Sequence, residues 1–172
     1  GVTARALPIG RDFKRAEDNE RGPNTGGMGS FAPVPGFGAD EVEELIDLTC
    51  RPILAELAAR GRPFVGTLFA GLMLTAAGPK VIEFNVRFGD PEAQVVLPLV
   101  EGSLAETLMA SATGKLAGRR AQFSSDRAVG VVLASRGYPA TSESGRVITG
   151  LDRAQAMPDV LVFQAATQLT DA

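Results

Sequence analysis

The chain has 172 residues, 45% of them hydrophobic and 22% charged, a balance typical of a globular protein with one domain or one domain and a small appendage. Its net charge of −3 argues against a protein that grips nucleic acid through a basic surface, although a few local cations suffice for a small phosphorylated ligand. One cysteine and no histidine exclude an internal disulfide, a Cys/His zinc site and a histidine-based triad, so any chemistry must use carboxylates, amides, Lys, Arg, backbone N–H groups or bound metal.

The chain has no apolar stretch near the ~20 residues that span a bilayer, and its first residues lack the apolar run of a signal peptide. We therefore expect a cytoplasmic protein with no membrane and no nucleic-acid partner. Because the first residue is not Met, we expect the chain to begin inside a larger protein.

The first predicted element is a long loop, because residues 1–39 are rich in Gly, Pro, Asn and charge. Asp40 then makes a suitable N-cap for a helix, since apolar residues recur at helical spacing from 42 to 57 and Gly61 provides a stop. Pro52 removes one backbone hydrogen bond inside this helix, so we expect a kink there.

Two β-strands are predicted next, at 64–75 and 80–88, and the turn residues between them favour an antiparallel hairpin. Asp90 and Pro91 then indicate an N-cap with proline in the first helical position, opening a helix towards Ala110 that Pro98 would divide.

The remaining residues predict a polar linker at 113–126 and then a small β-rich appendage. Its β-like runs lie at 128–134, 146–148 and 160–163. No closing element precedes the last residue, so we expect this appendage to be incomplete.

The predicted strand at 81–88 is the most informative segment for chemistry. Strand alternation places Glu83, Asn85 and Arg87 on one face and apolar residues on the other. Mg²⁺ prefers hard oxygen ligands, of which Glu83 and Asn85 can supply two, and Arg87 can bind a phosphoryl group bidentately. The pattern alone is equally compatible with an edge strand whose polar face meets water.

The segment 89–92 turns the chain into a helix N-terminus, where backbone N–H groups favour anions. Asp90 and Glu92 are either part of such a site or ordinary helix caps, and for Asp90 the pattern favours a cap.

A glycine-rich segment at 22–29 can bring the backbone close to a ligand and form an anion-binding nest, although a mobile turn is the commoner meaning of such a segment. It is not a P-loop, because no Gly-Lys-Ser/Thr ending follows. Upstream, Arg11, Lys14 and Arg15 bring three cations within five residues, which is either a solvated charge run or a phosphate-gathering patch.

These blocks together resemble the phosphoribosylamine–glycine ligase family of ATP-grasp enzymes. The resemblance rests on Arg-Asp-Phe-Lys-Arg at 11–15, Gly-Pro-Asn-Thr-Gly-Gly-Met-Gly at 22–29 and Glu-Phe-Asn-Val-Arg-Phe-Gly-Asp-Pro-Glu at 83–92, in this order and spacing. It covers nearly the whole chain, most strongly 7–36 and 63–98. It depends most on the glycine loop combined with the last block, because a Glu-x-Asn-x-Arg strand is shared widely among ATP-grasp enzymes.

The resemblance implies a ligase that joins glycine to 5-phosphoribosylamine through a glycyl phosphate, with ATP as co-substrate and Mg²⁺ or Mn²⁺ as cofactor. It implies Glu83 and Asn85 as metal ligands and Arg87 and Asp90 as catalytic residues. It further implies a substrate-binding set, which comprises Asp12, Lys14, Asn24, Thr25, Gly26 and Gly27.

The implied fold is α+β: the C-terminal lobe of an ATP-grasp domain with an antiparallel sheet at 1–112, a linker at 113–127 and a partial small β-rich C-terminal domain at 128–172. The resemblance also implies a missing N-terminal part of the same enzyme. Two departures from the family are Phe13, where His is usual, and Gln164-Ala165-Ala166-Thr167, where His-Ala-Gly-Thr is common.

Two other functions remain open from the sequence. One is a non-catalytic module derived from an ATP-grasp enzyme that serves as a structural or binding partner. The other is a different ATP-grasp carboxylate–amine ligase, which would leave the glycine-rich segment unexplained.

Overall fold

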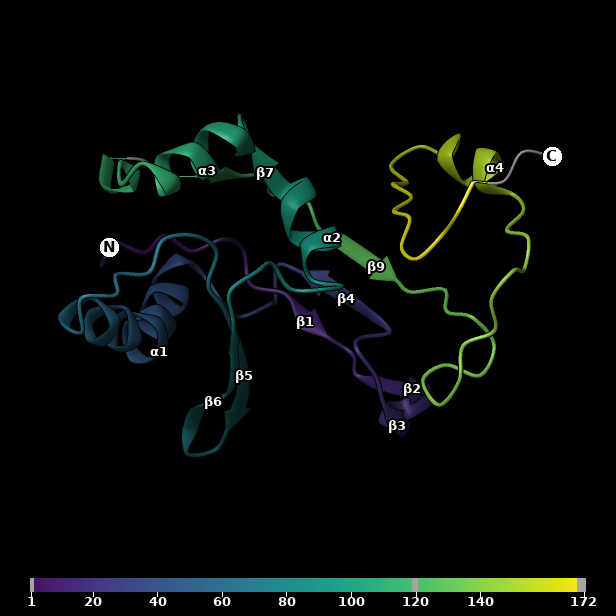
Figure 1. Ribbon diagram of the computed structural model, residues 1–172, viewed down its shortest axis with the longest axis horizontal. Helices are drawn as coiled ribbons and strands as arrows, with labels where there is room; N and C mark the ends of the chain where they lie inside the picture. Colours follow the sequence, from purple (N-terminus) through teal and green to yellow (C-terminus); the bar gives the residue numbers. More distant parts are fainter. Residues whose placement is uncertain (1, 119–120, 170–172) are drawn as a thin grey trace. The chain divides into compact units, whose positions relative to one another are not determined.

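The computed structural model describes residues 2–118 and 121–169 and divides the chain into two compact units, 1–133 and 134–172. The first unit is α+β, with small antiparallel sheets and helices (Figure 1). Its strands are β1 (Arg11–Asp12), β2 (Arg15–Glu17), β3 (Arg21–Asn24), β4 (Gly29–Ala32), β5 (Phe69–Thr75), β6 (Gly78–Asn85), β7 (Val100–Glu101), β8 (Gln122–Phe123) and β9 (Ala128–Val131). Its helices are α1 (Ala39–Ala59), α2 (Ala93–Val96) and α3 (Leu104–Ala112), with 3-10 turns at Asp18–Glu20, Leu97–Leu99 and Leu116–Gly118.

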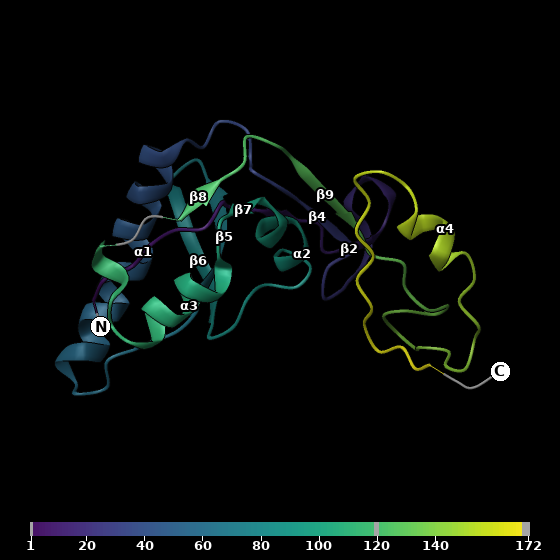
Figure 2. The ribbon, with the colours of Figure 1, turned by 90° about the horizontal axis from the view of Figure 1, so that it is seen from above.

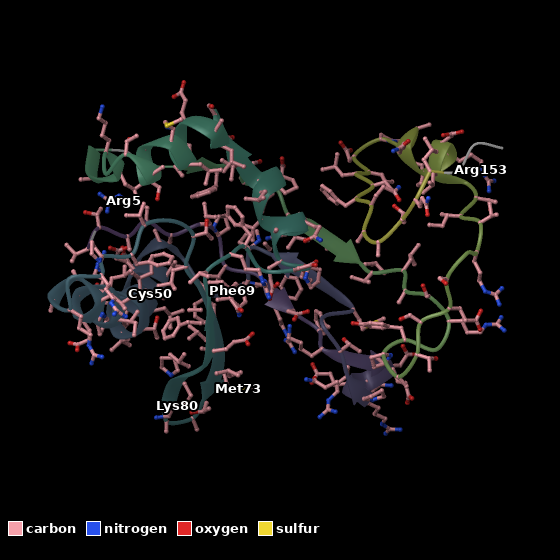
Figure 3. The ribbon with its side chains drawn as sticks, viewed as in Figure 1. Arg5, Cys50, Phe69, Met73, Lys80 and Arg153 are labelled. Atoms are coloured by element: carbon pink, nitrogen blue, oxygen red, sulfur yellow. The ribbon has the colours of Figure 1, made fainter. Side chains whose placement is uncertain are left out.

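The predicted antiparallel hairpin is confirmed as the pair β5–β6, although β5 begins at Phe69 rather than at 64 and β6 ends at Asn85 rather than at 88. Its turn end carries the pair Met73 and Lys80, and Phe69 lies at the other end opposite Asn85 (Figure 3). The pairing register shifts between Gly71 and Leu72, so Glu83 and Asn85 lie beyond the irregularity and alternation between them is intact.

The predicted first helix is also confirmed, as α1, which lies beside β5 and β6 in both views (Figures 1 and 2). Its N-cap is Gly38 rather than the predicted Asp40, because the Glu41 side chain reaches back and its Oε2 accepts a hydrogen bond from the Gly38 N–H at 2.9 Å. The helix runs through Pro52 as one element.

The loop predicted for 1–39 is wrong in part, because four short strands lie within it. β1 and β4 pair antiparallel, β2 and β3 pair antiparallel, and β9 completes a three-stranded sheet in the order β1–β4–β9. These strands have only two to four residues each, so they carry no readable period.

The core of the first unit lies where this sheet meets the segment after β6. Ala32 of β4 packs with Val95, Val96 and Leu99, and all four are buried. This contact fixes the segment 89–99 against β4.

The continuous helix predicted from 90 towards Ala110 is wrong, since the chain forms α2, a 3-10 turn, β7 and α3 instead. Pro98 lies in the first turn of the 3-10 segment that begins at Leu97, where its missing N–H is tolerated. Gly102 has a φ of 77°, which ends helical geometry before α3. Ser103 caps α3 through its Oγ, which accepts a hydrogen bond from the Glu106 N–H at 3.2 Å.

The second unit does not confirm the β-rich appendage. In the described part, 134–169, its one regular element is the short helix α4 (Leu151–Gln155), and no strand forms at 146–148 or 160–163. Ala166, which stands where the family often has glycine, has a φ of 52°. The left-handed region explains why glycine is suited to that position.

The expected domain division stays a prediction. Part of the expected linker pairs in the first unit, because β8 joins β7, and β9 belongs to the sheet of the first unit. Residues 119–120 of the expected linker and 170–172 of the expected appendage lie outside the described residues.

No helix among the described residues is both long enough and apolar enough to cross a membrane.

Candidate functional site

The glycine-rich segment is an ordered interruption in a long hairpin. β1 pairs with β4 and β2 with β3, and between these pairs the chain leaves regular pairing. Two backbone hydrogen bonds still connect the two sides of the hairpin across this interruption. Met28 N–H donates to Phe13 O at 2.7 Å, and Thr25 N–H donates to Lys14 O at 2.8 Å. The segment is therefore a loop held by backbone hydrogen bonds to both sides of the hairpin.

The anion-binding nest considered for this segment is not formed by these N–H groups. Those of Thr25 and Met28 bond to backbone carbonyls, and that of Gly27 donates to Thr25 Oγ1 at 3.1 Å. A nest requires such donors to point outward at a ligand.

The cations at 11–15 also act within the protein. Arg11 pairs with Glu20 at 3.0 Å and lies over the Phe13 ring, 4.9 Å from its centroid. Arg15 Nη1 donates to Gly22 O at 3.0 Å. Phe13 also packs near Phe31, with ring centroids 6.0 Å apart, so its contacts are aromatic.

Asp12 and Lys14 form an ion pair at the edge of the loop. The Lys14 Nζ contacts Asp12 Oδ2 and donates to Gly26 O at 3.0 Å. Partial burial acts to lower the pKa of Lys14, but the hydrogen bond and charge of Asp12 and the charges of Glu92 and Glu83 outweigh it and raise that pKa. Lys14 therefore contacts one carboxylate, Asp12, and interacts by charge with two more.

A tight junction joins the loop to the turn after β6. Gly27 is buried, with a φ of 138°, and a Cβ built on it would lie 2.3 Å from Pro91 Cδ and 2.8 Å from Asp12 Oδ1. Ser30, 2% exposed, donates from Oγ to Pro91 O at 2.8 Å. β4 and the loop thus clamp Pro91 from two sides.

The clamp places Glu92 beside the Asp12–Lys14 pair. Glu92 is half-buried and occupies the N-cap position of α2, but its side chain makes no capping hydrogen bond. Burial raises the pKa of Glu92, and the charge of Asp12 adds to this, while a hydrogen bond from its own backbone N–H and the charges of Lys14 and Arg87 act in the opposite direction. The prediction of Asp90 as N-cap and Pro91 as first helical residue is wrong, because the helix begins at Ala93. Asp90 Oδ1 instead accepts a hydrogen bond from Gln94 Nε2 at 2.8 Å.

Glu92→Gln is expected to stabilise the protein at neutral pH. A folded-state pKa above the ordinary value of 4.5 means that folding favours the protonated side chain, so the contribution of Glu92 is largest below pH 4.5 and is lost as the pH rises through the raised pKa. Glutamine cannot ionise, so the gain should grow from pH 4 to pH 7 in urea unfolding. The exposed Glu44→Gln serves as the control. A gain that is constant with pH would contradict the assignment.

The metal-ligand candidates lie on one face of β6. Glu83 pairs across the ribbon with Gly71, and a Cβ at Gly71 would lie 3.1 Å from Glu83 Cγ, so the absent side chain leaves the space that Glu83 occupies. Asn85 is half-buried, and its Nδ2 is buried without a hydrogen-bond partner among the described residues. Two oxygen donors on one face suit a metal completed by phosphates and water.

Arg87 departs from the predicted arrangement. β6 ends at Asn85, so Arg87 lies in the bend that follows, where its Nη1 donates to the neighbouring Phe88 O at 2.7 Å. Its charge still acts on Glu92. The apolar face of the strand is also not buried, because Ile82 and Val86 are 64% and 75% exposed.

The structure thus gathers most of the predicted site residues. Charge interactions join Lys14 to Asp12, Glu83 and Glu92, and they join Glu92 to Asp12. Gly26 and Gly27 border the same group. Thr25 anchors the loop, through hydrogen bonds from its N–H and Oγ1 to Lys14 O. Asn24 is exposed at the end of β3. Within the described residues, its side chain makes no contact with this group.

Glu92 is the member that the sequence left open between a site residue and an ordinary helix cap. The Gly-Asp-Pro-Glu turn at 89–92 is the sequence signal for it. Pro91 restricts where the helix can begin, and the carboxylate of Glu92 then lies just before the first helical residue. Within the described ranges, no three His, Cys, Asp or Glu side chains group closely enough to hold a metal by themselves. Asp12, Glu83 and Glu92 therefore all interact electrostatically with Lys14, but they do not form a metal site made of three carboxylates.

Comparison with known proteins places this arrangement in a family. Residues 1–93 match the model for the ATP-grasp (A) domain of phosphoribosylglycinamide synthetase. The chain is 46% identical to a phosphoribosylamine–glycine ligase of Leifsonia xyli over 97% of its own length, and 47% identical to that of Streptomyces coelicolor over 98%. It is also 44% identical, over 99% of its length, to the trifunctional purine biosynthetic protein adenosine-3 of Gallus gallus.

The chain spans about two fifths of these bacterial relatives, 40% and 41%, and 17% of the chicken protein. Among solved structures, it resembles the crystal structure of phosphoribosylamine–glycine ligase from Thermotoga maritima, with a TM-score of 0.69 and 38% identity. That likeness covers 80% of this chain and 34% of the other.

Proposed function

Since the chain belongs to the phosphoribosylglycinamide synthetase family of ATP-grasp proteins, we propose that it carries part of a site that joins glycine to 5-phosphoribosylamine. The reaction consumes ATP and releases glycinamide ribonucleotide, ADP and phosphate, a step of purine synthesis in the cytoplasm. The observation that carries the proposal is the group formed by Asp12, Lys14, Glu83 and Glu92, which unites the blocks shared with the family.

The proposed metal ligands are Glu83 and Asn85, which would hold Mg²⁺ or Mn²⁺. Their shared face on β6, opened by Gly71, supports this assignment. When bound, such a metal neutralises the phosphates of ATP and favours transfer of the terminal phosphoryl group. Two protein ligands leave the remaining positions to phosphate oxygens and water.

The reaction proposed for the site has two steps. The glycine carboxylate attacks the terminal phosphorus of ATP, which gives glycyl phosphate and ADP. The amine of 5-phosphoribosylamine then attacks the acyl carbon, forms the amide bond and expels phosphate. We assign Arg87 to the transferred phosphoryl group, since a guanidinium matches phosphate oxygens bidentately, and we keep Asp90 beside it in the site.

The glycine-rich loop supplies the proposed substrate wall. We assign Lys14, Thr25, Gly26 and Gly27 to this wall, because hydrogen bonds that close the hairpin hold them at one edge of the group. Asn24, exposed at the end of β3, is assigned to its outer rim. A rigid wall suits a reaction that depends on positioning, because a misplaced acyl phosphate would react with water. ATP, glycine and 5-phosphoribosylamine are the small partners, and the rest of the enzyme supplies the ATP pocket.

The test is product formation by the full-length protein. With ATP, Mg²⁺, glycine and 5-phosphoribosylamine, it should form glycinamide ribonucleotide with one ADP per product, and chelation of the metal should abolish the reaction. ATP hydrolysis that depends on another carboxylate and amine would favour a different ATP-grasp ligase. A folded protein with no nucleotide-dependent reaction would favour the non-catalytic module, which the departures at Phe13 and Gln164 motivate.

A further inference from the structure

The side chain of Asp90 is held by Gln94. Gln94 Nε2 donates to Asp90 Oδ1 at 2.8 Å from a position four residues later in the chain. Asp90 is exposed in a turn, and no other hydrogen bond or ion pair within the described residues fixes its carboxylate. An exposed side chain without such a bond populates several staggered rotamers. The orientation of the Asp90 carboxylate therefore depends on Gln94.

The backbone on both sides of this hydrogen bond is anchored. Pro91, which follows Asp90, is buried, and its carbonyl accepts a hydrogen bond from Ser30 Oγ at 2.8 Å. Gln94 lies in α2 directly before Val95, a core residue that is 1% exposed. Because both backbone segments are fixed, the two side chains meet in one defined geometry.

The other end of the Gln94 amide carries a cost. Its Oε1 is buried and accepts no hydrogen bond within the described residues. An ionised carboxylate can only accept hydrogen bonds, so the NH₂ end of the amide must face Asp90 and the oxygen must take the buried side. A buried acceptor without a donor disfavours folding and is rare in native proteins.

Stability does not account for this pair of side chains. An exposed side-chain hydrogen bond between residues four apart adds little to stability, less than a buried acceptor without a donor costs. A side chain at 94 without the buried oxygen would avoid that cost. The effect that remains for the amide of Gln94 is the placement of the Asp90 carboxylate.

We propose that Gln94 is a positioning residue, which holds the Asp90 carboxylate in the orientation that the ligase reaction requires. This proposal rests on the proposed function, in which Asp90 stands beside Arg87 at the transferred phosphoryl group. Gln94 touches no substrate and acts through Asp90. Its loss should therefore lower kcat and leave the KM for ATP nearly unchanged, because a misdirected carboxylate affects the reacting group more than the bound nucleotide.

The kinetic test uses the full-length enzyme and two variants of similar side-chain length. Gln94→Met removes the donor, and Gln94→Glu replaces it with a second carboxylate that repels Asp90. The kcat should fall at least about tenfold in Gln94→Met and further in Gln94→Glu, since a misplacement of about 1 Å can cost ~100-fold. The KM for ATP should change less than about twofold. Gln155→Met, at an exposed position on α4, is the matched control and should keep full activity.

Two further variants separate positioning from packing. Gln94→Lys restores an N–H donor of similar reach and should recover most of the kcat, which a packing role would not predict. The double variant Asp90→Asn/Gln94→Met should lose no more than Asp90→Asn alone, because residues that act as one unit are not additive. Additive losses would overturn the proposal, and so would a kcat for Gln94→Met within about twofold of the unaltered enzyme.

An NMR measurement tests the contact without catalysis. In the ¹⁵N-labelled enzyme, the side-chain amide signals of Gln94 are identified by their loss in Gln94→Met. These signals should shift in Asp90→Asn, while those of Gln155 stay in place. Unmoved Gln94 signals would overturn the proposal. An unaltered enzyme that forms no glycinamide ribonucleotide would overturn the proposed function, whereas product formation with an unaffected Gln94→Met would overturn only the role of Gln94.

Discussion

Gly27→Ala is expected to destabilise the protein by about 2–6 kcal/mol, and the fraction that still folds should have much lower activity. The new Cβ would lie 2.3 Å from Pro91 Cδ, an atom of a ring that cannot rotate away, and 2.8 Å from Asp12 Oδ1. The backbone φ of 138° adds strain for any residue with a side chain. The estimate combines ~1–3 kcal/mol for the backbone with ~1–3 kcal/mol for overpacking.

Gly36→Ala separates these two causes. Gly36 also has a positive φ, 84°, but a Cβ there would meet nothing within 4 Å. It should therefore show only the backbone cost, about 1 kcal/mol, with kcat unchanged. Urea unfolding and steady-state kinetics of both variants provide the measurement. Equal stability and equal kcat for the two variants would show that the contact between Gly27 and Pro91 does not hold the site together.

The elements that the sequence predicted well are those with a long, regular period. α1 and the β5–β6 hairpin each bring many residues to one pattern, and their type and approximate ends agree with the structure. The residues 1–39 offered no such pattern, because β1 to β4 are held by partners rather than by their own composition. β4, for example, is defined by β1 on one side and β9 on the other, about 100 residues away in sequence.

The same limit applies to the candidate site: features set by neighbours in sequence could be predicted, and those set by distant residues could not. Alternation placed Glu83 and Asn85 on one face, and the register agrees between these two positions. Alternation could not show that β6 ends before Arg87, since the Val-Arg-Phe run continues the pattern although no partner strand accompanies it. The proximity of Glu92 to Asp12 was also not readable, because it depends on Pro91 lying against Gly27 and Ser30.

The remaining large effect concerns Glu83, the proposed metal ligand. In the full-length enzyme, Glu83→Ala should lower kcat/KM by at least about 100-fold and raise the Mg²⁺ concentration needed for half-maximal rate. A metal contact to a transferring phosphoryl group contributes several kcal/mol, and each 1.36 kcal/mol is tenfold in rate. Asn85→Ala should show the same direction with a smaller effect, because an amide oxygen binds Mg²⁺ more weakly than a carboxylate.

The stability of the same variant distinguishes a ligand from a structural residue. Glu83 is exposed and lies over Gly71, so its removal should change the free energy of unfolding by no more than about 0.5 kcal/mol. Glu44→Ala should match that stability and keep full activity. Measurements at several Mg²⁺ and Mn²⁺ concentrations then decide the role. A Glu83→Ala enzyme with normal metal dependence would rule out β6 as the metal face, and one that loses both activity and stability would make Glu83 a structural residue of the hairpin.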